Sequence, residues 1–147
     1  MLEPLKSWYC DVCGEVIETV TEGYVVWDST KELKNKNIRI IHQRKCDIDS
    51  STSSSALADF VGVEGMVNLT SWLSLGIIKK KLGQGSFIQA EDMDEFVDFF
   101  RRVQLPYYED ARRRFSEHEI LDWYSDSNEV GVYLPEQLIA MINRPKY

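Results

Sequence analysis

The sequence has no long apolar run and no leader-like start. No stretch approaches the ~20 apolar residues that an α-helix needs to cross a bilayer, and residues 1–7 lack the apolar centre of a signal peptide. These two absences predict a cytoplasmic protein without membrane contact. Thiols stay reduced in that compartment and are therefore available to bind a metal ion.

Basic charge is also in short supply. Lys and Arg total 17 against 24 Asp and Glu, so the formal net charge is −7. Domains that bind nucleic acid usually carry a basic excess, and a chain with net negative charge repels a polyanion. The charge balance therefore disfavours nucleic acid as a partner and favours a basic protein.

No internal repeat, sustained heptad pattern or catalytic set is recognisable in the sequence. Gly83 and Gly85, beside the lysines at 79–81, lack the Gly-Lys-Ser/Thr ending of a phosphate-binding loop. Residues 77–88 are better interpreted as a turn between two short extended segments. His118 lies between two glutamates, with no identifiable nucleophile beside it. We therefore predict no enzymatic activity, and an enzyme of unknown class stays an alternative.

The chain is organised around two pairs of metal-ligating residues in its first third. One pair is Cys10 and Cys13, followed by Gly14, and the other is His42 and Cys46. A Cys-x-x-Cys turn can occupy two corners of a tetrahedron, and a His-x3-Cys turn the other two. Gly14 suits a backbone that turns through positive φ after the second cysteine. The pattern predicts one closed, structural Zn²⁺ site that uses every cysteine of the chain.

Three alternatives compete with a structural zinc site. A redox dithiol usually has a helix beginning at its first cysteine, whereas several β-branched residues follow Cys13. Three unrelated buried thiols also fit the sequence, because free cysteine packs as a small apolar residue. A catalytic zinc needs an open coordination position, and four candidate protein ligands already fill the shell.

The run Cys-x-x-Cys-Gly, followed by strands and a second ligand pair, resembles a zinc ribbon over residues 8–46. The second pair is His-x3-Cys in place of the commoner Cys-x2-Cys. A treble clef, with its second pair at the start of a helix, is the nearest alternative. Zinc ribbons serve as nucleic-acid contacts, protein-docking surfaces or structural clips. The resemblance therefore implies a metal and a local fold without implying one function.

The whole pattern predicts an α+β fold. A small antiparallel β lobe at 1–49 precedes a helical region at 50–147, either as two domains or as one continuous core. Short β-branched and aromatic runs predict strands at 16–20, 24–27 and 38–42. A lobe of ~40 residues is near the limit at which a core alone holds a fold, so metal binding should supply much of its stability.

Five or six helices are predicted beyond residue 50. The serines at 53–55 are interpreted as N-cap residues of the first helix, in preference to a flexible linker. The clearest pattern follows Asp92, which is placed to cap a helix with an apolar stripe at Met93, Phe96, Val97, Phe100 and Val103. Pro106 closes that helix.

Paired charges dominate the next predicted helix. Glu109 and Asp110 precede Arg113 and Arg114 by four residues each, which predicts ion pairs on an exposed helix face. The arginines at 112–114 are therefore interpreted as a paired, solvated surface.

Two further helices complete the predicted helical region. Ser116 and Glu119 form a capping-box pattern for one of them, and Pro135 opens the last. Residues 130–134 between these helices look extended.

The preferred function is a non-enzymatic, zinc-stabilised protein-binding module, of the kind represented by immunity proteins and antitoxins of bacteria and phages. Such a module would neutralise a basic partner through an acidic, aromatic-bearing surface in its helical half. The candidate contact residues are Asp94, Glu95, Asp98, Phe99, Glu109 and Asp110, with Tyr107 and Trp123 as further exposed aromatics. The competing interpretation is that these acids cap helices and pair with arginines while the aromatics fill the core.

A nucleic-acid-associated or regulatory zinc-ribbon protein is the first alternative. It requires the lysines at 79–81, Arg101 and Arg102, and the arginines at 112–114 to come together on one face of the fold.

Overall fold

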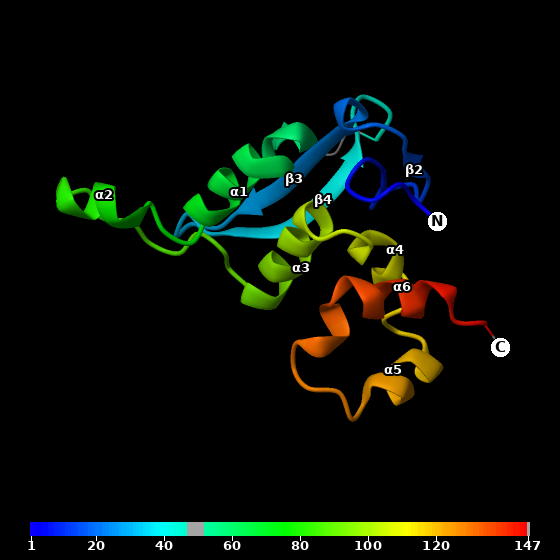
Figure 1. Cartoon of the computed structure of the whole chain (residues 1–147). Coiled ribbons are helices and arrows are strands. Elements are labelled where there is room, and N and C mark those ends of the chain that lie inside the picture. The colour runs from blue at the N-terminus through cyan, green and yellow to red at the C-terminus, as the bar shows by residue number, and fades with distance from the viewer. Residues whose placement is uncertain (47–51, 147) are drawn as a thin grey trace.

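The computed structural model describes residues 1–46 and 52–146 and has the predicted α+β fold (Figure 1). Its strands are β1 (Trp8–Tyr9), β2 (Val16–Ile17), β3 (Gly23–Ser29), β4 (Asn35–His42) and β5 (Ser53–Ala56). Its α-helices are α1 (Gly62–Ser71), α2 (Gly76–Lys81), α3 (Met93–Gln104), α4 (Tyr108–Arg112), α5 (His118–Tyr124) and α6 (Pro135–Asn143). Short 3₁₀ turns lie at Val20–Glu22, Leu57–Phe60 and Gly131–Tyr133.

The strands form two antiparallel sheets. One is the hairpin β1-β2, and the other has the order β4-β3-β5, so β3 is the central strand. Val25 of β3 lies opposite Ile40 of β4 and Ser55 of β5. Val25 and Ile40 are fully buried, and their neighbours Val26 and Ile41 are buried too, so both faces at the centre of this sheet are covered. The three strands predicted in this part of the chain are confirmed, with shifted bounds.

Two hydrophobic cores hold the fold together. The larger core joins strands β1, β2, β3 and β4 with α1 and α3, and aromatic rings fill its centre. Trp27, Phe60, Trp72 and Phe99 meet there at ring-centroid distances of 5.0 to 6.3 Å, mostly edge to face. The smaller core joins α4, α5 and α6 around Leu138. These three helices lie together at one end of the molecule (Figure 1).

The serine-rich segment is a strand where a helix start was predicted. Residues 53–55 belong to β5, which pairs with β3, and the helix cap predicted there is wrong. Serine hydroxyls favour a cap only when a helix follows directly, and here a free edge of β3 binds the segment instead. The predicted boundary near residue 50 falls outside the described residues. The chain on both sides of it contributes to one sheet and one core.

Other local predictions have mixed outcomes. The capped helix is confirmed as α3, where Asp92 Oδ1 accepts a hydrogen bond from Glu95 N at 3.1 Å. The last helix begins at Pro135 as predicted. Residues 77–88 were expected to be extended, but Gly76–Lys81 forms α2. Residues 130–134 contain a 3₁₀ turn instead of an extended segment.

The predicted capping box before α5 does not form. Glu117 occupies the N-cap position of that helix, without a side-chain hydrogen bond to its first turn. Its carboxylate is bound instead by Arg114, at 2.8 and 3.0 Å.

None of the described helices is both long enough and apolar enough to cross a membrane.

Candidate metal centre

The first ligand pair lies in the turn of the β1-β2 hairpin. Gly14 N donates to Cys10 O at 2.9 Å, and Val12 N points to Cys10 Sγ at 3.4 Å. Gly14 has φ of +76°, the left-handed conformation that this turn was predicted to need. Local hydrogen bonds therefore place the two cysteines on one tight turn, or knuckle.

The second pair lies at the end of β4. His42 is the last residue of that strand, and the turn that follows brings Cys46 back beside it, with Arg44 at φ of +69°. Asp11 N donates to Ile40 O at 2.8 Å, and Ile40 N donates to the Asp11 carboxylate at 2.7 Å. These two bonds fix the first knuckle against β4, and so bring the sequence-distant pairs together.

The four donor atoms form one compact cluster. Cys10, Cys13 and Cys46 Sγ and a ring nitrogen of His42 all lie within 4.8 Å of one another. His42 Nδ1 is 3.4 Å from Cys13 Sγ and 3.8 Å from Cys46 Sγ. Tetrahedral zinc, with bonds of ~2.3 Å to sulfur and ~2.0 Å to nitrogen, sets such N···S distances to about 3.6 Å. The described residues thus provide a Cys3His cluster suited to a metal ion, and its cysteines are not joined by a disulfide.

The tautomer of His42 also suits a ligand. His42 Nε2 lies 3.0 Å from Val16 O, and a carbonyl oxygen only accepts, so Nε2 carries the proton. The lone pair of Nδ1 then faces the three thiols. A metal-bound histidine usually donates its other ring N–H in this way, which orients the ring.

The thiols differ in acidity. Burial raises the pKa of the Cys10 thiol. Hydrogen bonds from the backbone N–H groups of Cys13, Val12 and His42 outweigh burial, and the net effect lowers this pKa to about 6. Burial raises the pKa of Cys46, and its neighbours Cys10 and Cys13 raise it more, to about 11. The neighbouring sulfurs thus oppose ionisation of Cys46, and a divalent cation between the sulfurs would remove that repulsion. The donor set therefore fits a cation.

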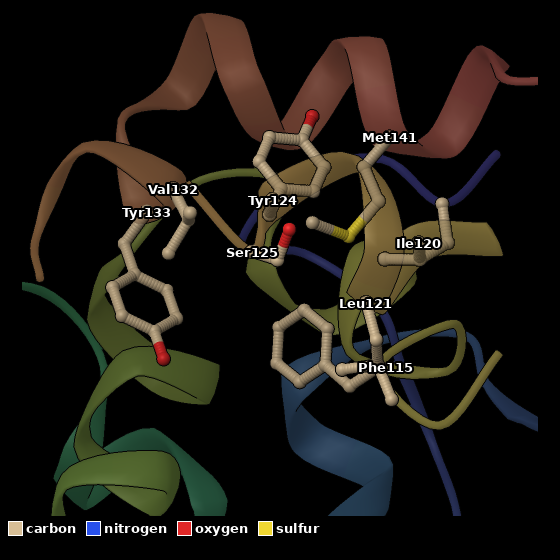
Figure 2. A pocket seen from close by; sticks show the side chains of 8 residues that line it. All are labelled: Phe115, Ile120, Leu121, Tyr124, Ser125, Val132, Tyr133 and Met141. Atoms are coloured by element: carbon tan, nitrogen blue, oxygen red, sulfur yellow. The ribbon is translucent and has the colours of Figure 1, made fainter. Parts of the chain in front are cut away.

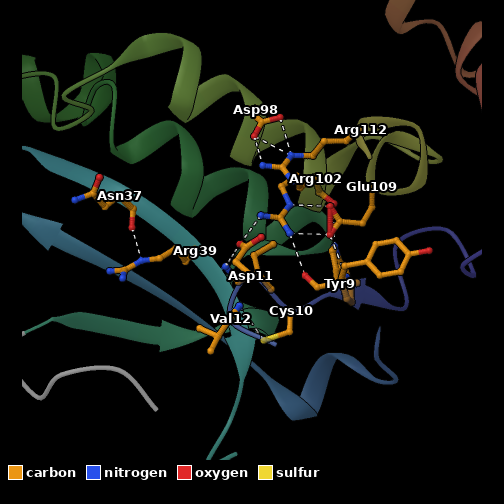
Figure 3. Close-up of polar contacts among 12 residues, drawn as sticks. Tyr9, Cys10, Asp11, Val12, Asn37, Arg39, Asp98, Arg102, Glu109 and Arg112 are labelled. Atoms are coloured by element: carbon orange, nitrogen blue, oxygen red, sulfur yellow. Dashed lines mark hydrogen bonds and ion pairs between the residues drawn. The ribbon is translucent and has the colours of Figure 1, made fainter. Parts of the chain in front are cut away.

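A buried arginine links this centre to the helices. Arg102 of α3 is only 3% exposed. Its guanidinium binds Glu109 through Nε–Oε1 at 2.7 Å and Nη2–Oε2 at 2.9 Å, and binds Asp11 Oδ2 through Nη1 at 2.7 Å (Figure 3). It also donates to Tyr9 O at 3.2 Å. Asp11, between the two candidate ligand cysteines, thus joins the knuckle to α3, and Arg102 continues the link to Glu109 of α4.

Sequence reasoning missed this network. It considered Arg102 as a possible contact for nucleic acid, and predicted an apolar stripe of this helix through Met93 and Phe100. The buried residues of α3 are Phe96, Phe99, Arg102 and Val103, while Met93 is 45% exposed. The buried stripe is rotated from the predicted one and includes an arginine. Helical spacing alone could not reveal this, because Arg102 follows Phe99 by three residues and the burial of Phe99 was itself not predicted.

Most of the predicted partner-contact residues already have partners within the chain. Phe99 is 2% exposed, so its predicted place on an exposed surface is wrong, because it packs against Phe60 and Trp72. Glu109 is buried against Arg102. Asp98 binds Arg112 and Tyr108, and Asp110 accepts from Leu2 N and Tyr9 Oη.

Few of the predicted contact residues remain accessible. Asp94 is exposed and Glu95 is half-buried, both in the first turn of α3. Of the other aromatics, Trp123 is 56% exposed and Tyr107 is half-buried.

The basic residues do not assemble into one face. Arg102 and Arg114 are buried, and Arg112 forms an ion pair with Asp98. The pairs predicted between Glu109 and Arg113 and between Asp110 and Arg114 are wrong, because both acids bind elsewhere. Arg113 lies over the ring of Tyr9 instead. The condition attached to the nucleic-acid hypothesis is therefore not met by these arginines.

Arg114 has a structural role in the smaller core. Its Nη1 donates to Met141 O at 2.7 Å and to Arg144 O at 2.5 Å, which satisfies carbonyls at the end of α6. His118, in contrast, lies on the surface, with its side chain 85% exposed and 3.2 Å from Asp122.

Comparison with known proteins adds no family. No protein-family model, curated protein or solved structure matches the chain. The likeness to a zinc ribbon therefore rests on the Cys3His cluster and its small antiparallel sheets alone.

Proposed function

We propose that this protein is a non-enzymatic protein-binding module, stabilised by a structural Zn²⁺ ion, that engages a basic partner. The zinc assignment is supported by three sulfur donors and one imidazole within 4.8 Å of one another, a donor set typical of closed structural zinc sites. With four protein ligands the shell leaves no position for a substrate. The ion holds β4 to the β1-β2 hairpin, and Asp11 extends that support to α3 and α4.

The observation that carries the binding role is an apolar pocket beside a segment whose Asp and Glu residues are not balanced by Lys or Arg. A cavity of about 360 Å³ opens between α5, α6 and the Gly131–Tyr133 turn. The side chains around it are shown in Figure 2 and are Phe115, Ile120, Leu121, Tyr124, Ser125, Val132, Tyr133 and Met141. Ile120 and Met141 are buried, while Leu121 is 56% exposed. Pockets of this kind hold the anchoring side chains of protein partners.

The stretch of chain that supplies most of the pocket lining is acidic, although Arg101 of α3 lies over the ring of Tyr133. Residues 115–130 include five acids and no Lys or Arg. Glu119 and Asp122 of α5 are exposed, as is Trp123 of the same helix. Exposed acids on one side of an apolar pocket attract a partner that presents an apolar anchor among basic residues, and complementary charge speeds the encounter. The acidic recognition surface is thus proposed on α5, one of the acidic stretches of the helical half, and not on α3.

An immunity or antitoxin-type role is the specific form of this proposal. In that role the acidic surface of α5 covers a functional basic site of another protein. Such a partner would associate rapidly at low salt and dissociate slowly once its anchor is seated.

The test is to isolate proteins bound to the tagged chain in its native host and to measure association with each basic candidate against ionic strength. The variant Glu119→Gln/Asp122→Asn should slow association at low salt by about tenfold or more. The matched control Glu91→Gln/Asp94→Asn removes the same charge from the start of α3 and should change the rate little. Equal rates for the α5 variant and wild type would refute the proposed surface.

A further inference from the structure

An arm of the chain stands away from both cores. Residues 74–88, here called the arm, contain α2 and are all exposed. Ile77, Ile78 and Leu82 are 73%, 75% and 65% exposed. Figure 1 shows α2 projecting far from the remaining elements, at the end of the two segments that connect it to α1 and α3. Aliphatic side chains so exposed on one element mark an interaction surface.

The base of the arm is fixed although its tip is free of the cores. Gln89 N donates to Trp72 O at 2.7 Å, and Asn35 N donates to Gln89 O at 2.5 Å. Trp72 belongs to the larger core. The arm is therefore presented from a firm base, with local backbone bonds such as Leu82 N to Ile78 O at 3.1 Å.

The charge of the arm is opposite to that of the rest of the chain. It carries lysines at 79–81 and no Asp or Glu, so the whole acidic excess lies elsewhere. All three lysines are exposed, and no described carboxylate pairs with them. Basic residues beside Ile77, Ile78 and Leu82 form the chemistry that the acidic pocket on α5 requires.

We infer that the arm docks into the α5 pocket of a second copy of this chain. The inference uses the pocket of the proposed function and supplies one occupant for it. Ile77 and Ile78 would enter the cavity lined by Leu121 and Tyr124. The lysines at 79–81 would then face Glu119 and Asp122.

The contact must form between molecules. The arm and α5 are well separated in the fold (Figure 1), and the clamped base keeps the arm away from the pocket of its own chain. Pairing of two arms would bring six lysines together and is opposed by repulsion. Arm and pocket are different surfaces, so the association is head to tail and yields a ring or an open chain.

One short arm makes a small interface. Small contacts are typical of weak, transient association, so we expect a dissociation constant on the order of 10 µM to 1 mM. Screening should weaken it as salt rises.

Two variants, one without a working arm and one without a working pocket, test the inference on the full-length, metal-loaded protein. Ile77→Ser/Ile78→Ser removes the anchors and keeps the pocket, and Leu121→Lys/Asp122→Lys blocks the pocket and keeps the arm. All four positions are exposed, and circular dichroism and metal content verify folding. In sedimentation velocity at about 0.2 mM, wild type should associate, and each variant alone should stay monomeric. An equimolar mixture of the variants should form a heterodimer.

Three results would overturn the inference. They are a monomeric wild type at that concentration, self-association of either variant alone, and a mixture of variants that stays monomeric. Arm-dependent binding to vesicles of anionic lipid by an otherwise monomeric protein would assign the arm to membranes instead. A monomeric protein whose basic partner still depends on Glu119 and Asp122 would keep the proposed function and refute only the self-pairing.

Discussion

The two cores of this protein are stabilised in different ways. The larger core combines short strands, two of them only two residues long, with a cluster of aromatic rings and the Cys3His centre. The smaller core, around Leu138, has no such cluster among its described residues, and an arginine ties its last helix in place. The comparison shows that the four candidate metal donors lie beside the shortest strands of the fold, β1 and β2, where few backbone hydrogen bonds hold the chain.

One buried side chain connects the larger core with the smaller core. Arg102 belongs to α3 in the larger core, and its partner Glu109 belongs to α4, which packs in the smaller core. Its other partner, Asp11, lies in the metal knuckle. The difference between the cores can therefore be tested by breaking the metal centre, the connection and the smaller core in turn.

Metal removal should have the largest effect. Structural zinc contributes about 10 kcal/mol or more to the folding of small metal-stabilised units, which exceeds the total stability of many domains. We expect Cys13→Ser to lose the metal and unfold at least residues 8–46, while α4 to α6 lose less protection. Amide hydrogen exchange and zinc analysis provide the measurements.

Matched histidine variants sharpen that experiment. His42→Ala should weaken metal binding, because Nδ1 of His42 faces the three thiols. His118→Ala should leave metal binding unchanged, since His118 is a surface residue of α5. Full thermal stability in excess chelator, with the metal shown to be gone, would contradict a structural role for the ion.

Breaking the connection should have the next largest effect. Arg102→Met leaves Glu109 buried without its cation and removes one partner of Asp11. Removing one member of a buried ion pair typically costs about 3–5 kcal/mol. We expect a loss of that size in urea unfolding, together with weaker metal binding. Arg113→Met is the control, because Arg113 is exposed, and it should cost under about 1 kcal/mol. Equal losses of unfolding free energy for both variants would show that the buried network stabilises the fold no more than an exposed arginine does.

Replacing Arg114 should destabilise the smaller core and leave the larger core folded. Arg114→Met removes the donors to Met141 O and Arg144 O and the ion pair with Glu117. We expect a loss of about 2–3 kcal/mol and faster amide exchange in α5 and α6, with the metal retained. Faster exchange spread equally over β3 and β4 would mean that the two cores unfold as one cooperative unit.

The smallest predicted effect concerns acid stability. Burial raises the pKa of Asp98, but hydrogen bonds from Arg112 and Tyr108 outweigh it and hold that pKa below its usual range. A lowered folded-state pKa gives stability that is present above the unfolded-state pKa, ~3.9, and is lost as pH falls through the folded value.

A matched variant isolates that contribution. Asp98→Asn should cost about 1–2 kcal/mol at pH 7, and the difference from wild type should shrink as pH falls below ~4. Thermal unfolding of both proteins across this range is the measurement. A difference that stays constant down to pH 2 would assign the effect to packing instead of charge.

Sequence patterns were reliable where the governing interactions are local. The knuckle follows from Cys-x-x-Cys-Gly, and its glycine adopts the positive φ that was predicted. The α3 cap needs only Asp92 and the backbone three residues on. Pattern reading failed where a distant segment decides the outcome, as for residues 53–55, which pair with β3. It also failed for Arg102 and Phe99, whose burial depends on neighbours far along the chain.

The sequence by itself determined the donor set of the metal centre, because ligand chemistry belongs to the side chains and the spacing within each pair is local. It also determined the acidic balance and the α+β composition. Only the tertiary structure decided which charges are exposed. The Arg102 to Asp11 contact spans 91 residues, and such contacts consume the arginines and acids that sequence alone placed on surfaces. The same packing left the arm and the α5 pocket uncovered, because burial is a property of the assembled chain and not of any segment within it.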